Sequence, residues 1–196
     1  MNLIEYINKG LTYEEYITRV EDDLENEVEN DDPKEYVQYY ALGLQRMNRV
    51  TKTFQLTSVQ ENRVKETPNN FKILSITEGW CGDASQILPV IEKLANALNV
   101  ESKYILRDEN LELMENYKTN NALSIPIVIG VAEDGSELFR FGPRPAYGME
   151  LLAKFKSSPD IYSADDFHED LQKYYNTNKG VDIVDEILDL VDENLA

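Results

Sequence analysis

Residues 71–90 read FKILSITEGWCGDASQILPV and contain the signals that decide the fold. Phe71 to Thr77 is a short apolar run, long enough for a buried strand. From Gln86 to Leu98 the period changes to that of a helix, whose apolar face carries Ile87, Leu88, Ile91, Leu94, Ala95 and Leu98. The turn that contains Cys81 therefore joins a strand to a helix.

The chain beyond this helix continues to alternate between strand and helix patterns. The expected elements are a strand at Ser102 to Leu106, a short helix at Leu111 to Tyr117, strands at Pro126 to Val131 and Glu137 to Phe141, and a closing helix at Tyr147 to Phe155. Asp134-Gly135 between the last two strands is a strong hairpin signal. This order is typical of an α/β protein.

The segment before residue 71 is expected to be helical. Thr12 to Glu15 form a capping-box pattern that opens a helix to about Glu27, and Asn30 to Pro33 form a break whose proline suits the first turn of a second helix. That second helix has an apolar stripe, which we expect to pack against a neighbour, made of Tyr36, Tyr40, Gly43, Met47, Val50 and Phe54. Thr67 to Asn70 read as a linker.

Two more helical patterns follow Ser158. Ser163 to Asp166 form a second capping-box candidate. Val181 to Val191 are amphipathic, with Val184, Ile187, Leu188 and Val191 on one side and acidic residues on the other. We expect this helix to pack on the body of the protein rather than to act as a detachable partner-binding tail.

Composition limits the classes of function. The 196 residues suffice for one buried core, and the net charge of −18 disfavours nucleic acid and anionic lipid surfaces as partners. No secretory signal is visible at Met1 to Glu5, and no stretch approaches the roughly 20 apolar residues that span a bilayer. The single cysteine excludes an intramolecular disulfide. We therefore expect a cytoplasmic protein.

Several motifs in this order resemble the thioredoxin family. The turn of that family reads Trp-Cys-Gly-Pro-Cys, and Trp80 to Ala84 read Trp-Cys-Gly-Asp-Ala. Pro89 matches the proline of the family's active-site helix, and Ser124-Ile125-Pro126 match its cis-proline loop. Gly142 to Pro145, Gly-Pro-Arg-Pro, resemble a segment of an acidic branch with a Cys-Gly-Asp turn. The resemblance covers about Phe71 to Ser157.

The resemblance implies a thioredoxin-like α/β fold, with a central mixed sheet flanked by helices. We expect this domain at residues 68–157, with helical extensions at residues 1–67 and 158–196. It also implies a catalytic role for Cys81 and a substrate groove formed by Trp80, Gly82, Asp83, Ile125 and Pro126. Ile125 precedes the proline, and its backbone is expected to pair with a bound peptide.

The turn retains only one half of a dithiol site. A cysteine at the start of a helix faces unpaired N–H groups that favour the thiolate. The family's second cysteine falls at Ala84 and its buried carboxylate at Ser75, so no internal thiol can resolve a mixed disulfide. Ser85 lies about 100° around the helix from Ala84 and is no substitute.

Two residues of the turn admit more than one interpretation. Asp83 either disfavours the thiolate or, as we favour, caps the helix together with Gln86. Cys81 is either an inert core residue or, as we favour, an accessible thiol. We expect Arg144 to be structural or at the surface rather than an anion site, and His168 to be an exposed polar residue without partners for a metal site.

Three functions therefore remain open. The first is a monothiol oxidoreductase, in which Cys81 exchanges with protein or low-molecular-weight disulfides and an external thiol releases it. The second is a non-enzymatic module whose groove at Trp80, Ile125 and Pro126 binds an extended segment. The third is a redox sensor based on oxidation of Cys81. No cofactor or metal is expected, and the sequence leaves the oligomeric state open.

Overall fold

The computed structural model describes residues 2–28 and 37–195. The expected break at Asn30 to Pro33 and the first stripe residue, Tyr36, lie outside the described residues. Within the described part of the chain, no helix is long and apolar enough to cross a membrane.

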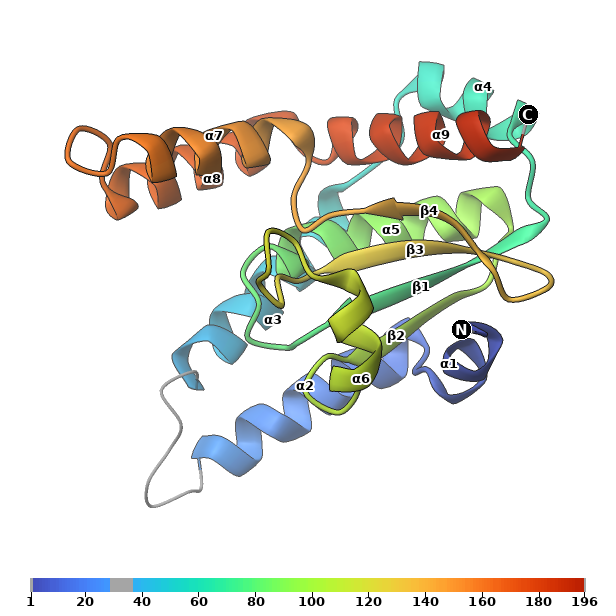
Figure 1. Ribbon diagram of the computed structural model, residues 1–196, viewed down its shortest axis with the longest axis horizontal. Helices are drawn as coiled ribbons and strands as arrows, with labels where there is room; N and C mark the ends of the chain where they lie inside the picture. Colours follow the sequence, from blue (N-terminus) through green and yellow to red (C-terminus); the bar gives the residue numbers. More distant parts are fainter. Residues whose placement is uncertain (1, 29–36, 196) are drawn as a thin grey trace.

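Helices surround a small central sheet (Figure 1). The strands are β1 (Phe71–Thr77), β2 (Ser102–Leu106), β3 (Ile127–Ala132) and β4 (Glu137–Phe141). The helices are α1 (Ile4–Lys9), α2 (Tyr13–Val28), α3 (Val37–Thr53), α4 (Ser58–Glu66), α5 (Ala84–Leu98), α6 (Leu111–Met114), α7 (Ala146–Ser157), α8 (Ala164–Asn178) and α9 (Val181–Leu195), with a 3-10 turn at Glu115–Tyr117.

The four strands form a mixed sheet in the order β2-β1-β3-β4. β1 runs parallel to β2 and antiparallel to β3, and β3 runs antiparallel to β4. The β3–β4 hairpin turns at Gly135, whose φ of +85° suits a residue without Cβ. This mixed sheet with flanking helices confirms the α/β class, and the Asp-Gly hairpin signal is confirmed with it.

Local signals in the sequence predict most of these elements. The capping boxes at Thr12 and Ser163 are confirmed, with backbone and side-chain bonds to Glu15 and Asp166 respectively. Two helices, α1 and α4, were not predicted. α4 has a third capping box, formed by Thr57 and Gln60, but its mostly polar sequence shows no apolar stripe.

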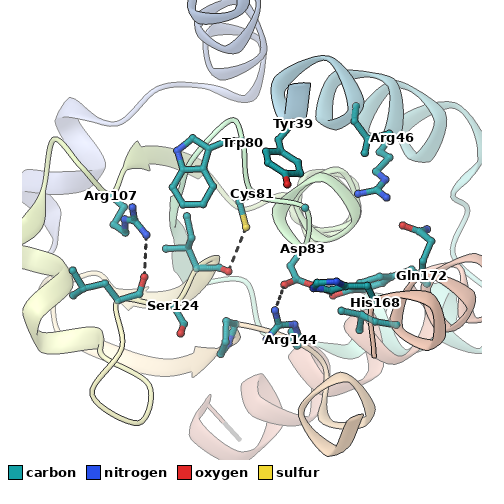
Figure 2. A pocket seen from close by; sticks show the side chains of 17 residues that line it. Tyr39, Arg46, Trp80, Cys81, Asp83, Arg107, Ser124, Arg144, His168 and Gln172 are labelled. Carbon is teal, nitrogen blue, oxygen red and sulfur yellow. Dashed lines mark hydrogen bonds and ion pairs between the residues drawn. The ribbon is translucent and has the colours of Figure 1, made fainter. Parts of the chain in front are cut away.

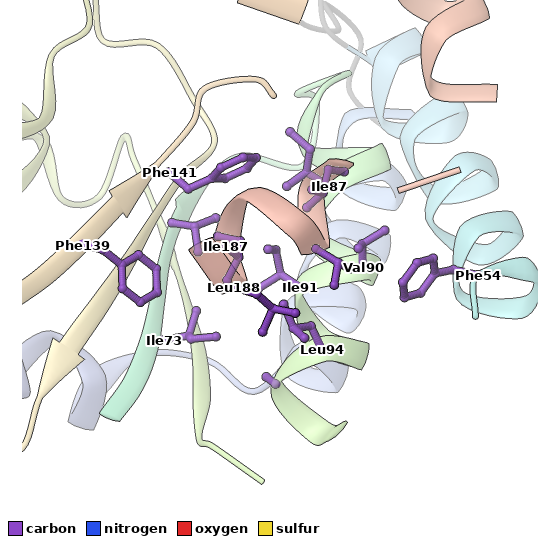
Figure 3. Close-up of a cluster of buried hydrophobic side chains, with 14 of the residues drawn as sticks. Phe54, Ile73, Ile87, Val90, Ile91, Leu94, Phe139, Phe141, Ile187 and Leu188 are labelled. Atoms are coloured by element: carbon purple, nitrogen blue, oxygen red, sulfur yellow. The ribbon is translucent and has the colours of Figure 1, made fainter. Parts of the chain in front are cut away.

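The apolar core lies on both faces of the sheet because successive strand residues point to opposite sides. On one face Ile73 belongs to a cluster with β4, α5 and α9, and on the other its neighbour Leu74 belongs to a cluster with α1, α2 and α6. Figure 3 shows the first cluster, where the labelled side chains are Phe54, Ile73, Ile87, Val90, Ile91, Leu94, Phe139, Phe141, Ile187 and Leu188.

The C-terminal helix α9 packs on the body, as expected from its pattern. Its apolar side is completely buried, at Val184, Ile187, Leu188 and Val191.

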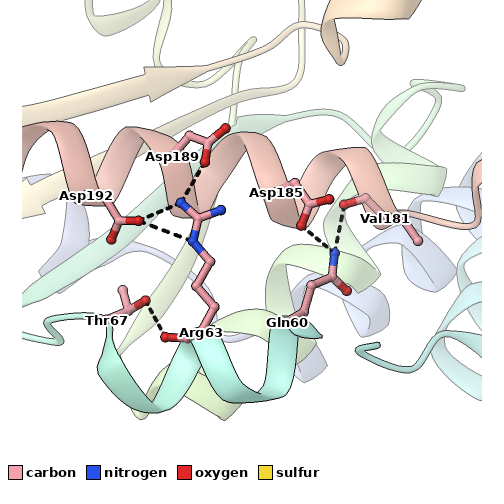
Figure 4. Close-up of polar contacts among 7 residues, drawn as sticks. All are labelled: Gln60, Arg63, Thr67, Val181, Asp185, Asp189 and Asp192. Atoms are coloured by element: carbon pink, nitrogen blue, oxygen red, sulfur yellow. Dashed lines mark hydrogen bonds and ion pairs between the residues drawn. The ribbon is translucent and has the colours of Figure 1, made fainter. Parts of the chain in front are cut away.

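The acidic side of α9 faces α4, where Arg63 contacts Asp189 at 2.6 Å and Asp192 at 2.5 Å (Figure 4). Gln60 of α4 also donates to the Val181 carbonyl at 3.0 Å and to Asp185 at 2.8 Å.

Helix α3 packs closely on the turn after β1. A Cβ atom on Gly43 would lie 3.0 Å from the Gly79 carbonyl oxygen, so a glycine permits this approach. Tyr40, Met47 and Phe54 of the predicted stripe are buried, which confirms that the stripe packs against a neighbour. The same contact places Tyr39, Leu42 and Arg46 of α3 beside the cysteine turn.

Candidate functional site

A cavity of about 600 Å³ lies over the turn between β1 and α5 (Figure 2). Its wall comes from the turn itself, the residue after β2, the loop before β3, the segment after β4, and helices α3 and α8. The structure places five of the expected site residues in this wall, namely Trp80, Cys81, Gly82, Asp83 and Ile125. Pro126 is not among the lining residues, and the Ile125–Pro126 peptide bond is cis.

The Cys81 thiol is closed in. The residue is only 7% exposed, and its Sγ donates to the Ile125 carbonyl at 3.4 Å and accepts from the Ala84 N–H at 3.5 Å. Burial raises the pKa of Cys81 to about 12, the Asp83 carboxylate adds to this rise, and the N–H groups of Ala84 and Asp83 oppose it. The expectation of an accessible thiol that favours the thiolate is therefore wrong, because desolvation outweighs the helix N-terminus.

Asp83 does not cap α5, which corrects the expectation from its spacing to Gln86. Its backbone is already helical, with φ −69° and ψ −43°, and its side chain makes no capping hydrogen bond. The carboxylate instead contacts Arg144 at 2.7 Å and accepts from the Tyr175 hydroxyl at 2.8 Å. The Asp83 side chain thus binds partners that are distant in sequence instead of capping the helix.

The Asp83–Arg144 pair is largely buried. Burial raises the pKa of Asp83, and Arg144 and Tyr175 oppose that rise. Arg144 comes from the Gly-Pro-Arg-Pro segment after β4 and fits the structural role expected for it, although its buried Nε has no hydrogen-bond partner in the part of the chain that the structure describes. The arginine supplies the opposite charge that a buried carboxylate needs.

Two further arginines line the cavity, and no motif in the sequence marked either of them. Arg107 pairs with Asp108 at 2.8 Å, donates to the Leu123 carbonyl at 3.2 Å and lies 4.8 Å from the centre of the Trp80 ring. Arg46, on α3, reaches the turn from the other side, as Figure 2 shows. Tyr175, the partner of Asp83, was likewise missed, because α8 is remote from the turn in sequence.

Ser75 on β1 and Glu78, directly after Thr77 at its end, are both buried polar residues. Glu78 is 5% exposed, burial raises its pKa to about 7, and the Asp108 N–H opposes this rise by donating to its carboxylate at 2.8 Å. Ser75, at the position where the thioredoxin family has a buried carboxylate, is completely buried, and its hydroxyl has no hydrogen-bond partner among the described residues. Glu78 was not identified from the sequence, which offers only a lone acid before Trp80.

The cavity has no evident metal set. Among residues 2–28 and 37–195, no three His, Cys, Asp or Glu side chains are grouped so as to hold a metal ion. His168 is exposed on α8, as expected, and lies at the cavity.

Comparisons with known proteins agree on the fold. A family model described as thioredoxin matches residues 30–156, and no curated protein matches the chain. The crystal structure of a protein of unknown function from Pseudomonas aeruginosa is similar, with 15% identity, a TM-score of 0.61 and 98% of each chain covered. The crystal structure of an HIV epitope scaffold is similar with 14% identity, a TM-score of 0.64, and 98% of this chain and 99% of that chain covered. At these identities the two structures show a shared fold alone.

Proposed function

Because the chain belongs to the thioredoxin family, we propose that it is a thioredoxin-like binding module whose pocket at the cysteine turn takes an extended peptide segment without redox turnover. The observation that carries this proposal is the state of Cys81, which is 7% exposed and hydrogen-bonded to the Ile125 carbonyl. Thiol–disulfide exchange needs a thiolate, and the raised pKa of this thiol opposes its formation.

The same surroundings suit binding. A cavity of about 600 Å³ is within the range of about 300–1,000 Å³ that is usual for ligand pockets. Its wall offers apolar side chains for a ligand, among them Trp80, Leu123 and Leu171. The Ile125 N–H takes part in no hydrogen bond among the described residues and is available to an extended backbone.

The division into a central domain and two helical extensions is part of this proposal. The expected N-terminal extension, residues 1–67, contributes Tyr39 and Arg46 to the pocket. The expected C-terminal extension, residues 158–196, contributes Gln172 and Tyr175. In this view the extensions build the walls of the binding site around residues 68–157. The lone cysteine fits a reducing cytoplasm, which stays a prediction.

Monothiol exchange is the second candidate, and the position of Cys81 in the pocket wall beside Ile125 favours it. In that reaction the Cys81 thiolate attacks a disulfide, forms a new S–S bond and releases the other sulfur as a thiolate. A low-molecular-weight thiol then attacks the mixed disulfide and frees Cys81, because residue 84 is alanine. This reaction, like oxidation of Cys81 in a sensor, requires the thiol to become exposed and ionised.

Alkylation of Cys81 by iodoacetamide as a function of pH separates these functions, with Cys81→Ser as the blank. The binding module predicts reaction at pH 7.5 much slower than that of a free thiol, with a rate that still rises above pH 10. Reaction faster than that of a free thiol at pH 7.5 would contradict the proposal and support exchange. The variant Ala84→Cys adds a second readout, since a working exchange site should then reduce a test disulfide such as that of insulin.

A further inference from the structure

We propose that the pocket selects a peptide segment that carries a carboxylate, and that Arg46 is the residue that binds this group. The inference rests on the proposed function, because it names the chemistry of the segment that the pocket takes. Its evidence is independent of Cys81 and comes from the distribution of charge.

The pocket wall differs in charge from the rest of the molecule. The chain has 37 acidic and 19 basic residues. Among the described residues that line the pocket, however, the charged side chains are three arginines and one carboxylate, namely Arg46, Arg107, Arg144 and Asp83. An anionic group that the net charge of the chain repels therefore meets an attractive potential on reaching the pocket.

Two of these arginines already have anionic partners. Arg144 pairs with the buried Asp83 at 2.7 Å, and Arg107 pairs with Asp108 at 2.8 Å while it stacks on Trp80. A ligand that recruited either of them would have to compete with an existing ion pair. These two side chains shape the pocket, and their charges are largely compensated.

Arg46 is different. Its guanidinium makes no hydrogen bond and no ion pair within the described part of the chain, and a Cβ atom on Gly82 would lie 3.5 Å from its Nη1. Burial lowers the pKa of Arg46 and the charge of Arg49 adds to this effect, while Asp83 opposes it. Asp83, however, is held by Arg144 and Tyr175. Arg46 thus presents a partly desolvated cation directly beside the cysteine turn.

A carboxylate fits this arrangement better than a phosphate. One guanidinium matches the two oxygens of one carboxylate in a bidentate pair. A phosphate would bring about two negative charges and a third oxygen, and the pocket has no second arginine with an uncompensated charge among its described lining residues. The net charge of −18 also repels a doubly charged ligand more strongly.

The test uses the full chain and a positional-scanning library of acetylated, amidated hexapeptides with an otherwise uncharged frame, to which a phosphoserine pool is added. We expect Asp and Glu to be selected at one position. The best peptide and its counterpart with Gln at that position are then titrated against the wild type, Arg46→Gln and Lys52→Gln. Lys52 is exposed on the same helix and does not line the pocket, so it is a control with the same change in charge.

For the wild type and Lys52→Gln, replacing the acid by Gln should weaken binding about tenfold or more, as expected for a hydrogen bond to a charged group. For Arg46→Gln the two peptides should bind equally, and Arg46→Lys should restore part of the preference. Circular dichroism confirms that each variant is folded.

The two proposals fail in different ways. If the folded wild type binds no peptide of the library, the proposed binding function is wrong. If it binds peptides without preference for an acid, or selects phosphoserine instead, or if Arg46→Gln keeps the preference for the acid, the binding function stands and the role of Arg46 is overturned.

Discussion

The guanidinium of Arg144 lies 2.7 Å from the carboxylate of Asp83, so the segment after β4 is joined to the turn that begins α5. The Tyr175 hydroxyl, from α8, donates to the same carboxylate at 2.8 Å. Three parts of the chain that are far apart in sequence therefore meet at one buried group, directly beside Cys81.

Replacing Arg144 by Met should leave the buried Asp83 without its opposite charge. We expect a loss of about 3–5 kcal/mol in the free energy of unfolding, measured by urea denaturation at pH 7.5. Adding Asp83→Asn to this variant should recover part of the loss, because the stranded charge is then removed. Strictly additive effects of the two changes would contradict a direct interaction.

Replacing Asp83 by Asn should lower the pKa of Cys81, because the Asp83 carboxylate is the second largest cause of its rise. Alkylation of Cys81 at pH 9 should become several-fold faster, while the pKa stays above its ordinary value because burial remains. Asp165→Asn, an exposed change at the start of α8, is the control. An unchanged rate for Asp83→Asn would show that the carboxylate does not act on the thiol.

Glu78 should make the stability of the protein fall as pH rises from about 4.5 to about 7. Its pKa rises from 4.5 to about 7 on folding, mainly through burial, so the folded state binds more protons than the unfolded state in this window. Glu78→Gln keeps an acceptor for the Asp108 N–H and should gain on the order of 2 kcal/mol relative to the wild type between pH 4.5 and pH 8. Urea denaturation at several pH values measures this difference, and a gap that is independent of pH would refute it.

Helix α9 should be held by its apolar side rather than by its ion pairs. Leu188 is completely buried, so Leu188→Ala should cost about 2–5 kcal/mol. Arg63 contacts Asp189 and Asp192, whose side chains are 63% and 46% exposed, so Arg63→Ala should cost about 1 kcal/mol or less. Thermal or urea unfolding of the two variants gives the comparison, and equal losses would mean that the ion pairs matter more than we infer.

The sequence by itself determined the architecture of the centre of the chain. The bounds expected for the strands at Phe71–Thr77, Ser102–Leu106 and Glu137–Phe141 are those observed, and the amphipathic helix from Val181 packs as its pattern predicts. These features follow from periodicity and turn chemistry, which act between residues close in sequence. The mostly polar helix α4 was not predicted because its sequence has no apolar stripe, and in the structure it contacts α9 through Gln60 and Arg63.

Only the tertiary structure decided the chemistry of the turn. A cysteine at a helix start and an Asp three residues before Gln86 suggest an activated thiol and a helix cap. In the folded protein Cys81 is buried, and the Asp83 carboxylate pairs with Arg144 and accepts a hydrogen bond from Tyr175. The tertiary structure also places Arg46 in the wall of the same pocket. The physical reason is that the pKa of a thiol and the partner of a carboxylate depend on desolvation and on charges brought from distant segments. The local pattern of residues determines neither the pKa of Cys81 nor the partner of Asp83.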